Sequence, residues 1–322
     1  MKYLNYKDIA LVPRHSSLKS RSLADTSVDF LGYKFSLPVI PANMCDVINI
    51  DIAKQLSDFN YFYIMHRWFD GVDKTNENIS YVLDFVRVMS SEKRLVSISI
   101  GVGSLWENMI STIKENKLCV DFITVDVAHA DHENIKSIIE CVKNNLPNTK
   151  LIVGNVATAE GCEYLIKLGV DAVKIGIGGG SICSTFYKTG FHVPMFSCCL
   201  QCAPICEKYD IPFIADGGIK EFGDIAKALA GGATMVMAGG IFAECIDSPA
   251  DIINGQKVYR GSTSYAMKGI NLHIEGNTIT MNHSVKYLER LKEISDSLSS
   301  AISYAGGADL SVFNLVNYII IN

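Results

Sequence analysis

The chain has 322 residues, of which 48% are hydrophobic and 20% charged, and this composition excludes disordered, collagenous and coiled-coil proteins. Its 29 Lys and Arg residues against 34 Asp and Glu residues give a net charge of −5, without a dense basic block, so we expect no nucleic-acid partner. No apolar run approaches the roughly 18 residues that span a bilayer. The 10 cysteines lack the spacing of a small secreted scaffold. We therefore expect a cytoplasmic protein with no membrane partner.

Eight short, apolar, β-rich runs recur along the chain, and each is followed by a polar or glycine-containing turn and a stretch with helical periodicity. The runs cover residues 37–41, 61–65, 95–101, 122–127, 151–153, 172–176, 212–215 and 234–238. Continuous apolar strands are typical of a parallel sheet that is covered on both faces. The alternative is a doubly wound open sheet, but no G-x-G-x-x-G motif follows the first run.

We therefore predict an α/β fold of one domain over residues 1–322, a (β/α)8 TIM barrel. An N-terminal segment precedes the barrel. A loop excursion or short hairpin follows the eighth strand at about 252–277, and a last helix is expected at about 284–303. The chemistry of such a barrel lies at the carboxyl ends of the strands, so the residues directly after each run are the candidate site.

Glycine-rich turns follow the seventh and eighth predicted strands, at Asp216-Gly217-Gly218 and Gly239-Gly240. At these positions of a barrel, backbone N–H groups commonly hold a phosphate, and glycine lets the backbone approach it closely. The carboxylate of Asp216 would accept hydrogen bonds from ribose hydroxyls. The alternative is that the glycines serve only tight turns. The phosphate interpretation predicts a nucleotide or sugar-phosphate ligand.

The sixth predicted strand leads into a glycine-rich loop, IGIGGGSICST at 175–185, which carries Cys183. Proximity to helix N-termini favours the thiolate, which is the nucleophilic form of cysteine. Free cysteine is also commonly a small buried apolar residue, so the residues alone leave both roles open. A second cysteine-rich stretch, with Cys198, Cys202 and Cys206 spaced four apart, predicts one face of a buried helix, because a single Cys-x-x-Cys pair is too little for a metal site.

Segments found in order along nearly the whole chain resemble the inosine monophosphate dehydrogenase and guanosine monophosphate reductase family. They include LPVIPANM at 37–44, YFYIMHR at 61–67, DVAHAD at 126–131, GNVATAEG at 154–161, GIGGGSICSTFYKTGF at 176–191, IADGGIKEFGDIAKAL at 214–229 and SSAISYAGGADL at 299–310. The resemblance implies a barrel in which the cysteine of the glycine-rich loop, here Cys183, adds to C2 of a purine nucleotide.

The two activities of this family differ in the step after that addition. The resemblance implies that the dehydrogenase uses a mobile flap with an Arg-Tyr pair and usually carries a CBS-domain insert. Here the stretch 66–95 is too short for such an insert, and 261–275 contains no arginine. The resemblance therefore favours the reductase, which converts GMP to IMP and ammonia with NADPH. Two alternatives are the NAD-dependent dehydrogenase, which oxidises IMP to XMP, and a purine-nucleotide-binding barrel that has lost catalysis.

The resemblance also implies individual roles. The catalytic residues are Cys183 and the proton-handling pair of Thr185 and Glu275. The residues that match substrate positions are Ser181, Asp216, Gly217, Gly218, Gly239, Gly240, Tyr259, Gly261, Ser262, Thr263 and Gly276. Those that match cofactor positions are Ser20, Arg21, Arg67, Asp126, Val127, Ala128, Ile177 and Gly178, with Ser20 and Arg21 reaching the cofactor of a neighbouring subunit. The carbonyls of Gly178, Gly180 and Cys183 match a potassium loop, and the family implies a homotetramer.

Several residues depart from the family pattern. Gly179 stands where the family has proline, so we expect a more flexible loop there. Phe186 stands where a basic residue usually follows the threonine, and Met195 replaces a usual glutamine. Cys45 follows the PANM segment where an acidic or amide residue is more common. Gly179, Phe186 and Cys45 motivate the alternative of a degenerate binding protein.

Overall fold

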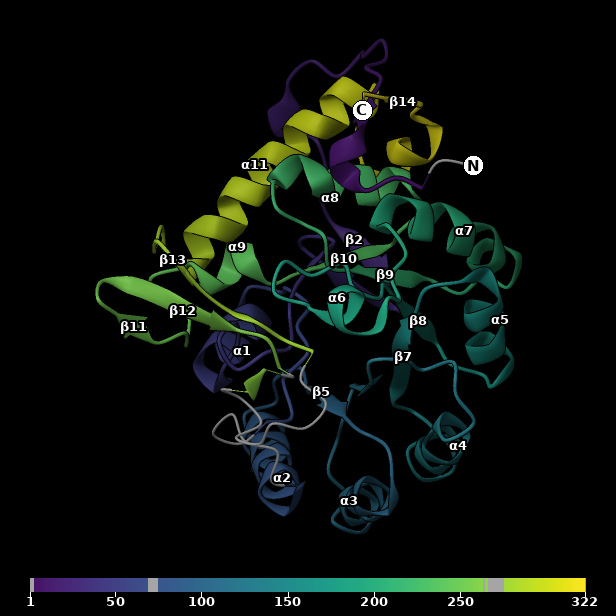
Figure 1. Ribbon diagram of the computed structural model, residues 1–322, viewed down its shortest axis with the longest axis vertical. Coiled ribbons are helices and arrows are strands. Elements are labelled where there is room, and N and C mark those ends of the chain that lie inside the picture. The colour runs from purple at the N-terminus through teal and green to yellow at the C-terminus, as the bar shows by residue number, and fades with distance from the viewer. Residues whose placement is uncertain (1–2, 69–74, 263, 266–274, 322) are drawn as a thin grey trace.

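The computed structural model of the chain describes residues 3–68, 75–262, 264–265 and 275–321. Its centre is a curled parallel sheet with helices packed around the outside (Figure 1). The strands of this sheet are β4 (Val39–Pro41), β5 (Ser97–Ile100), β6 (Phe122–Asp126), β7 (Lys150–Val156), β8 (Ala172–Ile175), β9 (Phe213–Asp216) and β10 (Met235–Ala238). Their order is β4-β10-β9-β8-β7-β6-β5, and every neighbouring pair is parallel.

The second predicted strand, residues 61–65, is not a regular strand. Met65 alone forms a parallel bridge, opposite Ile98 of β5, through backbone hydrogen bonds of 3.0 and 2.9 Å to the residues on either side of it. At the other end of the segment, the carbonyl of Asn60 accepts the N–H of Ser36, just ahead of β4, at 2.9 Å. The segment thus pairs with β5 at one position, and the bond between Ser36 and Asn60 holds its start near the residues that precede β4. The (β/α)8 barrel is confirmed: seven regular strands form the sheet, and residues 61–65 occupy the position of the remaining strand between β4 and β5.

Helices alternate with the strands. They are α1 (Ile50–Asp58), α2 (Thr75–Ser91), α3 (Ser104–Glu115), α4 (Ile135–Asn145), α5 (Ala159–Lys167), α6 (Thr185–Thr189), α7 (Met195–Lys208), α8 (Phe222–Ala230) and α9 (Gly240–Ala243). Their apolar residues recur at helical spacing; α4, for example, buries Ile135, Ile138, Ile139 and Val142. Among the described residues, β4 and β5 are separated only by α1, the 61–65 segment and α2, so no inserted domain lies there.

The amino end of the barrel is closed by a hairpin, β2 (Val28–Phe30) paired with β3 (Tyr33–Phe35). Its Phe30 and Phe35 pack against Phe62 with ring centres 5.4 and 5.0 Å apart, and Phe62 packs against Phe122 at 4.8 Å. Phe122 is the first residue of β6, so this aromatic cluster lies at the amino end of the strands. The opposite, carboxyl end is where polar residues gather.

After β10 the chain forms an antiparallel sheet of β11 (Ile252–Ile253), β12 (Gln256–Arg260) and β13 (Thr278–Met281), where we expected a loop or a short hairpin. Figure 1 shows this sheet projecting to one side of the barrel, with the long helix α11 (Tyr287–Ala305) above it. The last elements are η3 (Leu310–Leu315) and β14 (Tyr318–Ile320), and β14 pairs antiparallel with β1 (Ile9–Leu11). Both termini therefore lie at the same end of the molecule.

The cysteine-rich stretch forms helix α7, and its four cysteines, Cys198, Cys199, Cys202 and Cys206, are all buried. Within the described part of the chain, no group of three or more His, Cys, Asp or Glu side chains is arranged to hold a metal ion. Cys198, Cys202 and Cys206 are buried on helix α7, as the sequence predicted. Of the helices that the structure describes, none has the length and apolar character needed to cross a membrane.

Candidate active site

Cys183, Thr185 and Glu275 form a continuous row at the carboxyl end of the barrel. The Cys183 thiol donates to Thr185 Oγ1 over 3.1 Å, and the Thr185 hydroxyl donates to Glu275 Oε2 over 2.7 Å. Cys183 lies on the loop after β8 and Thr185 is the first residue of α6, whereas Glu275 lies ahead of β13. The fold therefore brings this neighbouring thiol and hydroxyl into a hydrogen-bonded row with a carboxyl group that lies 90 positions after Thr185.

Backbone contacts hold the two segments of this row together. The N–H of Ser184 donates to the carbonyl of Glu275 at 2.7 Å, and the N–H of Asn277 donates to the carbonyl of Ile182 at 2.8 Å. Gly276 forms an antiparallel bridge with Cys183 between these two bonds. The position of the carboxylate is thus set by main-chain pairing as well as by its own hydrogen bond.

Two predicted substrate residues, Gly261 and Gly276, cross each other closely beside this row. A Cβ atom on Gly261 would lie 2.8 Å from the Cα of Gly276, and one on Gly276 would lie 2.8 Å from the backbone nitrogen of Ser264. Side chains at either position would therefore push the two segments apart. Ser262 lies next to this crossing, and the predicted residue Thr263 falls outside the described residues.

The cysteine loop borders a cavity of about 420 Å³. Predicted residues that line it are Gly178, Gly180, Ser181, Cys183 and Gly218, and the cations Lys7 and Lys220 also line it. In the described part of the chain, no backbone acceptor takes the N–H of Gly218 or of Gly240, so both groups are available to a ligand. Free backbone N–H groups together with lysines suit an anionic ligand such as a phosphate.

Tyr259 lies over the start of α9. A Cβ atom on Gly239 would sit 2.0 Å from the Tyr259 hydroxyl oxygen, so only glycine admits the ring there. Burial raises the pKa of Tyr259 above its ordinary value, which keeps the hydroxyl protonated and able to donate. Gly217 and Gly218 turn the chain after β9 with φ of 94° and 81°, in the left-handed region that favours glycine.

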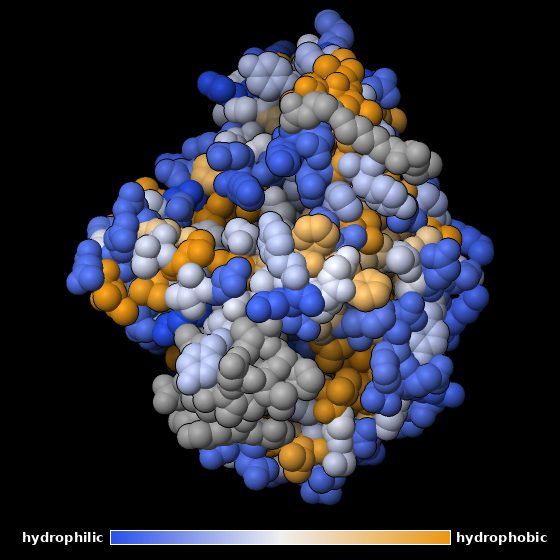
Figure 2. Space-filling model, viewed as in Figure 1, coloured by the Kyte–Doolittle hydropathy of each residue, from blue (hydrophilic) through white to orange (hydrophobic). Residues whose placement is uncertain are grey.

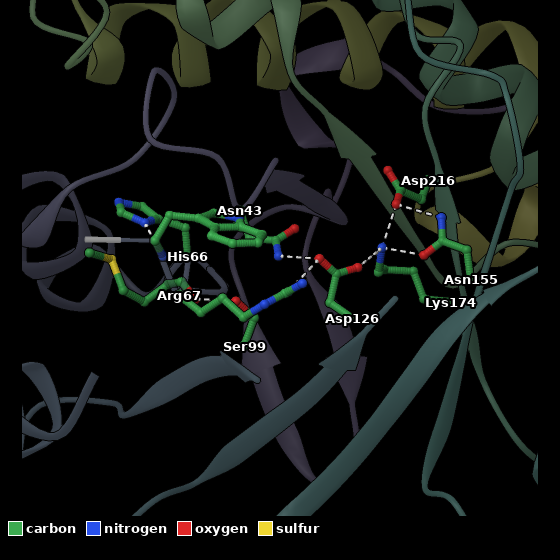
Figure 3. Close-up of polar contacts among 10 residues, drawn as sticks. Asn43, His66, Arg67, Ser99, Asp126, Asn155, Lys174 and Asp216 are labelled. Atoms are coloured by element: carbon green, nitrogen blue, oxygen red, sulfur yellow. Dashed lines mark hydrogen bonds and ion pairs between the residues drawn. The ribbon is translucent and has the colours of Figure 1, made fainter. Parts of the chain in front are cut away.

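A line of charged side chains crosses the carboxyl end of the sheet (Figure 3). The Lys174 ammonium lies between two carboxylates, 2.9 Å from Asp126 Oδ1 and 2.5 Å from Asp216 Oδ2. Arg67 Nη1 approaches the other oxygen of Asp126 at 3.4 Å, and Asn43 Nδ2 donates to the same oxygen at 3.0 Å. The predicted cofactor residues Arg67 and Asp126 are thereby connected to the predicted ribose residue Asp216.

These charges hold one another in the ionised form. Burial alone would raise the pKa of Asp126, but Lys174 and Arg67 hold it well below its usual range. Burial alone would lower the pKa of Lys174, but Asp126 and Asp216 raise it above its usual range. Asp126 and Lys174 therefore both remain charged across the physiological pH range.

A cavity of about 210 Å³ opens onto this line of charges. Its lining combines residues predicted for the cofactor with residues predicted for the substrate, namely Arg67, Asp126, Val127, Ala128, Asp216 and Ser262. A second cavity, of about 420 Å³, shares Arg67, Trp68 and Val127 with it and extends along the turn after β5 to Trp106. The guanidinium of Arg67 lies 4.6 Å from the centre of the Trp68 ring. The two cavities together have room for a ligand that continues away from Asp216.

Other predicted cofactor residues lie elsewhere. Ser20 and Arg21 stand at the start of η2 (Arg21–Leu23), where Arg21 donates to Ser300 of α11 at 3.3 Å, and they line none of these cavities. Ile177 is on the cysteine loop, and its carbonyl accepts a hydrogen bond from His192 Nδ1 at 2.9 Å. Within one chain, the structure does not bring Ser20 or Arg21 to Cys183.

Sequence reasoning missed Lys174, which holds the centre of the line of charges. The signal was present: a lysine stands inside the apolar strand Ala172–Ile175, with its side chain only 2% exposed. A buried lysine needs partners, so the sequence could have indicated facing carboxylates.

The packing beneath the cysteine loop explains one departure from the family pattern. Met195 is buried against three glycines, Gly176, Gly179 and Gly218. A Cβ atom added to any of them would lie 3.0 Å or less from a side-chain atom of Met195. A proline at position 179, which has a Cβ, would overlap this methionine. Gly179 therefore makes room for Met195, which gives the glycine at this position a packing explanation.

Comparison with known proteins defines the class to which this site belongs. The model of the IMP dehydrogenase / GMP reductase domain matches residues 3–320. The chain therefore belongs to the IMP dehydrogenase / GMP reductase family, whose names denote oxidoreductases.

The individual relatives carry a narrower name. Proteins named GMP reductase from Staphylococcus aureus strains JH9 and Mu50 are each 40% identical to the chain, over 100% of it and 97% of their own length. A protein of the same name from strain Newman is 39% identical over the same shares.

Proposed function

We propose that this protein catalyses the NADPH-dependent reductive deamination of GMP to IMP and ammonia. The observation that carries the proposal is the row of Cys183, Thr185 and Glu275, with its contacts of 3.1 and 2.7 Å. A thiol beside a hydroxyl and a carboxyl suits a reaction in which the nucleophile adds to carbon while an amine is protonated and leaves. The name GMP reductase, carried by relatives 40% identical to the chain, supports the same activity.

In the proposed reaction the Cys183 thiolate forms a bond from Sγ to C2 of the purine, and the bond from C2 to the exocyclic amine breaks. The proton lost by Cys183 passes through Thr185 to Glu275 and from there, by the same hydroxyl, to the amine, which leaves as ammonia with the electron pair of the broken bond. A hydroxyl alone is a poor acid at neutral pH, so it needs the carboxyl group 2.7 Å away.

Reduced nicotinamide, when bound, supplies the hydride that C2 accepts. The bond between C2 and Sγ then breaks, its electron pair returns to Cys183, and the thiolate takes up a proton from water as IMP leaves. The reaction thus consumes GMP, NADPH and one proton, and gives IMP, NADP⁺ and ammonia. Cys183 ends the cycle unchanged.

The other site residues would hold the nucleotide in place. The free N–H groups of Gly218 and Gly240, the Tyr259 hydroxyl over Gly239, and the Ser181 hydroxyl would donate hydrogen bonds to the phosphate. Asp216 precedes that turn and would accept from the ribose hydroxyls. The crossing of Gly261 and Gly276, with Ser262 beside it, would face the base. Gly217 and Thr263 remain substrate residues that the sequence predicts.

The described residues fit a reduced nicotinamide nucleotide beside Asp126. The cavities that share Arg67 and Val127 lead away from Asp216, offer a carboxylate for hydroxyls, and carry a guanidinium for a phosphate. Asp126, Val127, Ala128, Ile177 and Gly178 would hold the nicotinamide end. Ser20 and Arg21 would reach the cofactor of another subunit, as the sequence implied.

Potassium, a homotetramer and the cytoplasm remain predictions of the sequence. Gly178, Gly180 and Cys183 share one loop, and the Gly180 carbonyl, which accepts from the Cys183 N–H, has a second lone pair for a cation that would steady the loop. Apolar side chains gather at the end of the molecule where α11 and the C-terminus lie, which suits contact with another subunit (Figure 2). Sedimentation as a monomer with full activity would contradict the tetramer.

The absorbance of reduced nicotinamide tests the activity directly. We expect the purified protein to consume NADPH in the presence of GMP, and we expect Cys183→Ala to abolish this. Formation of reduced nicotinamide from IMP and NAD, without the first reaction, would instead establish the dehydrogenase. No change of absorbance in either mixture would leave only the alternative of a degenerate binding protein. Each mixture is compared with and without potassium.

A further inference from the structure

Lys174 of β8 is a buried lysine, and every N–H of its ammonium group has a hydrogen-bond acceptor. Its side chain is 2% exposed, and its three N–H donors meet three acceptors: Asp126 Oδ1 at 2.9 Å, Asp216 Oδ2 at 2.5 Å and Asn155 Oδ1 at 2.5 Å. A single ammonium therefore balances two carboxylates that come from two different strands, β6 and β9.

The two carboxylates flank the Lys174 ammonium and line the same cavity of about 210 Å³, but they have different neighbours. Asp126 faces Arg67 and the cavity proposed for the cofactor, whereas Asp216 precedes the glycine turn proposed for the nucleotide phosphate. The hydrogen bonds that Lys174 and Asn155 donate to Asp216 both reach Oδ2, and Figure 3 shows the other oxygen directed away from them. Lys174 thus fixes the carboxylate of Asp216 and leaves one oxygen for a ligand.

We propose that Lys174 is a positioning residue that holds Asp216 for the nucleotide ribose and Asp126 for the cofactor, and so ties the two halves of the site together. The inference rests on the proposed function. Lys174 is not assigned a contact with Cys183 Sγ or with C2 of the purine. It acts through the two carboxylates and the amide of Asn155.

The two carboxylates depend on Lys174 to different degrees. Asp126 would keep Arg67 at 3.4 Å and Asn43 at 3.0 Å if the ammonium were removed. Asp216 would keep, among its described partners, only the Asn155 amide at 2.9 Å, and Asn155 itself would lose the donor to its Oδ1. Loss of Lys174 should therefore weaken nucleotide binding more than cofactor binding.

The test measures binding without turnover, in a Cys183→Ala background of the full chain, by equilibrium dialysis with GMP alone and with NADPH alone. We expect Asp216→Asn to weaken GMP binding alone and Asp126→Asn to weaken NADPH binding alone. Lys174→Met should weaken both, GMP by roughly 100-fold and NADPH by roughly 10-fold, in line with the loss of hydrogen bonds to charged groups. If this variant unfolds, Lys174→Gln replaces it, because it keeps an N–H donor without the charge.

A double variant separates positioning from general damage. In Lys174→Met the two carboxylates face each other with no cation between them, so adding Asp126→Asn should restore part of the lost GMP affinity. A merely structural lysine gives no such recovery. Lys257 supplies the matched control: it is also a buried lysine, 2% exposed, but it donates to the backbone carbonyls of Ser248 and Ala250. Lys257→Met should lower the melting temperature and leave the ratio of the two affinities unchanged.

The outcomes separate this inference from the proposed function. If the parent binds GMP and NADPH but Lys174→Met and Lys174→Gln weaken only one ligand or neither, or if the double variant shows no recovery, the positioning role is wrong and the proposed function stands. If the parent binds neither ligand, the proposed function fails, and the inference fails with it.

Discussion

The two ends of strand β6 belong to opposite regions of the molecule. At its start, Phe122 packs with Phe62 and the β2–β3 hairpin in an aromatic cluster that closes the amino end of the barrel. At its end, Asp126 lies between Arg67 and Lys174, in a line of charges that opens into cavities. Five residues of one strand thus run from packed aromatic rings to a concentration of ionised side chains.

The difference teaches where stability and chemistry reside in this fold. Burial of aromatic side chains stabilises the folded chain in proportion to the area removed from water. Burial of charges costs desolvation energy, which the attraction between Asp126 and Lys174 must offset, so buried ion pairs add little net stability. The amino end should therefore govern the free energy of unfolding, and the carboxyl end should govern catalysis.

The largest expected effects come from changes in the proposed catalytic row, which leave the amino end of the barrel unaltered. Glu275→Gln keeps the shape of the side chain but cannot take up a proton, and Thr185→Val removes the hydroxyl that joins it to Cys183. We expect each change to lower kcat by roughly 10²- to 10⁴-fold, the usual contribution of general acid–base catalysis. Steady-state kinetics with GMP and NADPH measures this. Thr185→Ser is the control, since it keeps the hydroxyl and should retain most of the activity.

The second prediction concerns the amino end, where a change should lower stability and leave the site unaffected. Phe62→Ala removes a fully buried ring from the aromatic cluster and should cost roughly 3–5 kcal/mol of the free energy of unfolding. Denaturant titration measures the loss, and KM for GMP should change little, because the cluster lies at the end of the barrel opposite the site. Phe59→Ala is the matched control: Phe59 is 55% exposed and should change stability little. A large change in KM with unchanged stability would contradict the division between the two ends.

A third prediction concerns His66, which is buried and in contact with Cys45 and Tyr81. Burial lowers the pKa of His66 to about 4, below the usual value near 6.5. The unfolded chain therefore binds a proton between these two pH values and the folded chain does not, so stability falls as the pH drops through that window. The full loss from this group is about 3 kcal/mol.

Melting temperatures between pH 7 and pH 4 measure that loss. We expect His66→Phe to be less stable at neutral pH but to show a shallower decline toward acid. An equal slope in the two proteins would show that other groups cause the acid instability.

The smallest expected effect concerns the packing beneath the cysteine loop. Gly179→Ala would place a Cβ atom 2.7 Å from Met195 Cγ, so it should cost roughly 1–3 kcal/mol. Gly223→Ala, in helix α8, meets nothing within 4 Å and should be neutral or stabilising. Thermal unfolding of the two variants compares them. If both behave alike, Met195 is not what requires glycine at position 179.

The sequence predicted the barrel because apolar runs and helical periods are local patterns. The segment 61–65 misled that reasoning: Phe62 and Met65 are as apolar as strand residues, but Phe62 is buried by the aromatic cluster and Met65 forms a single bridge. Periodicity reports burial and does not report hydrogen bonding.

The site was predicted less completely. The pairing of Thr185 with Glu275, 90 positions apart, came from the family resemblance, because no local pattern specifies so distant a contact. Lys174 escaped notice because its role depends on carboxylates from two other strands, and such a convergence exists only in the folded sheet.

Catalysis is proposed to depend on the row of Cys183, Thr185 and Glu275, which would remove the amine from GMP before hydride is added to C2. The most direct test measures ammonia, IMP and consumed NADPH in the same reaction mixture. We predict equal amounts of the three with the wild-type protein, and none of them with Cys183→Ala. NADPH consumed without ammonia, or turnover that survives Cys183→Ala, would contradict the proposed role of this row.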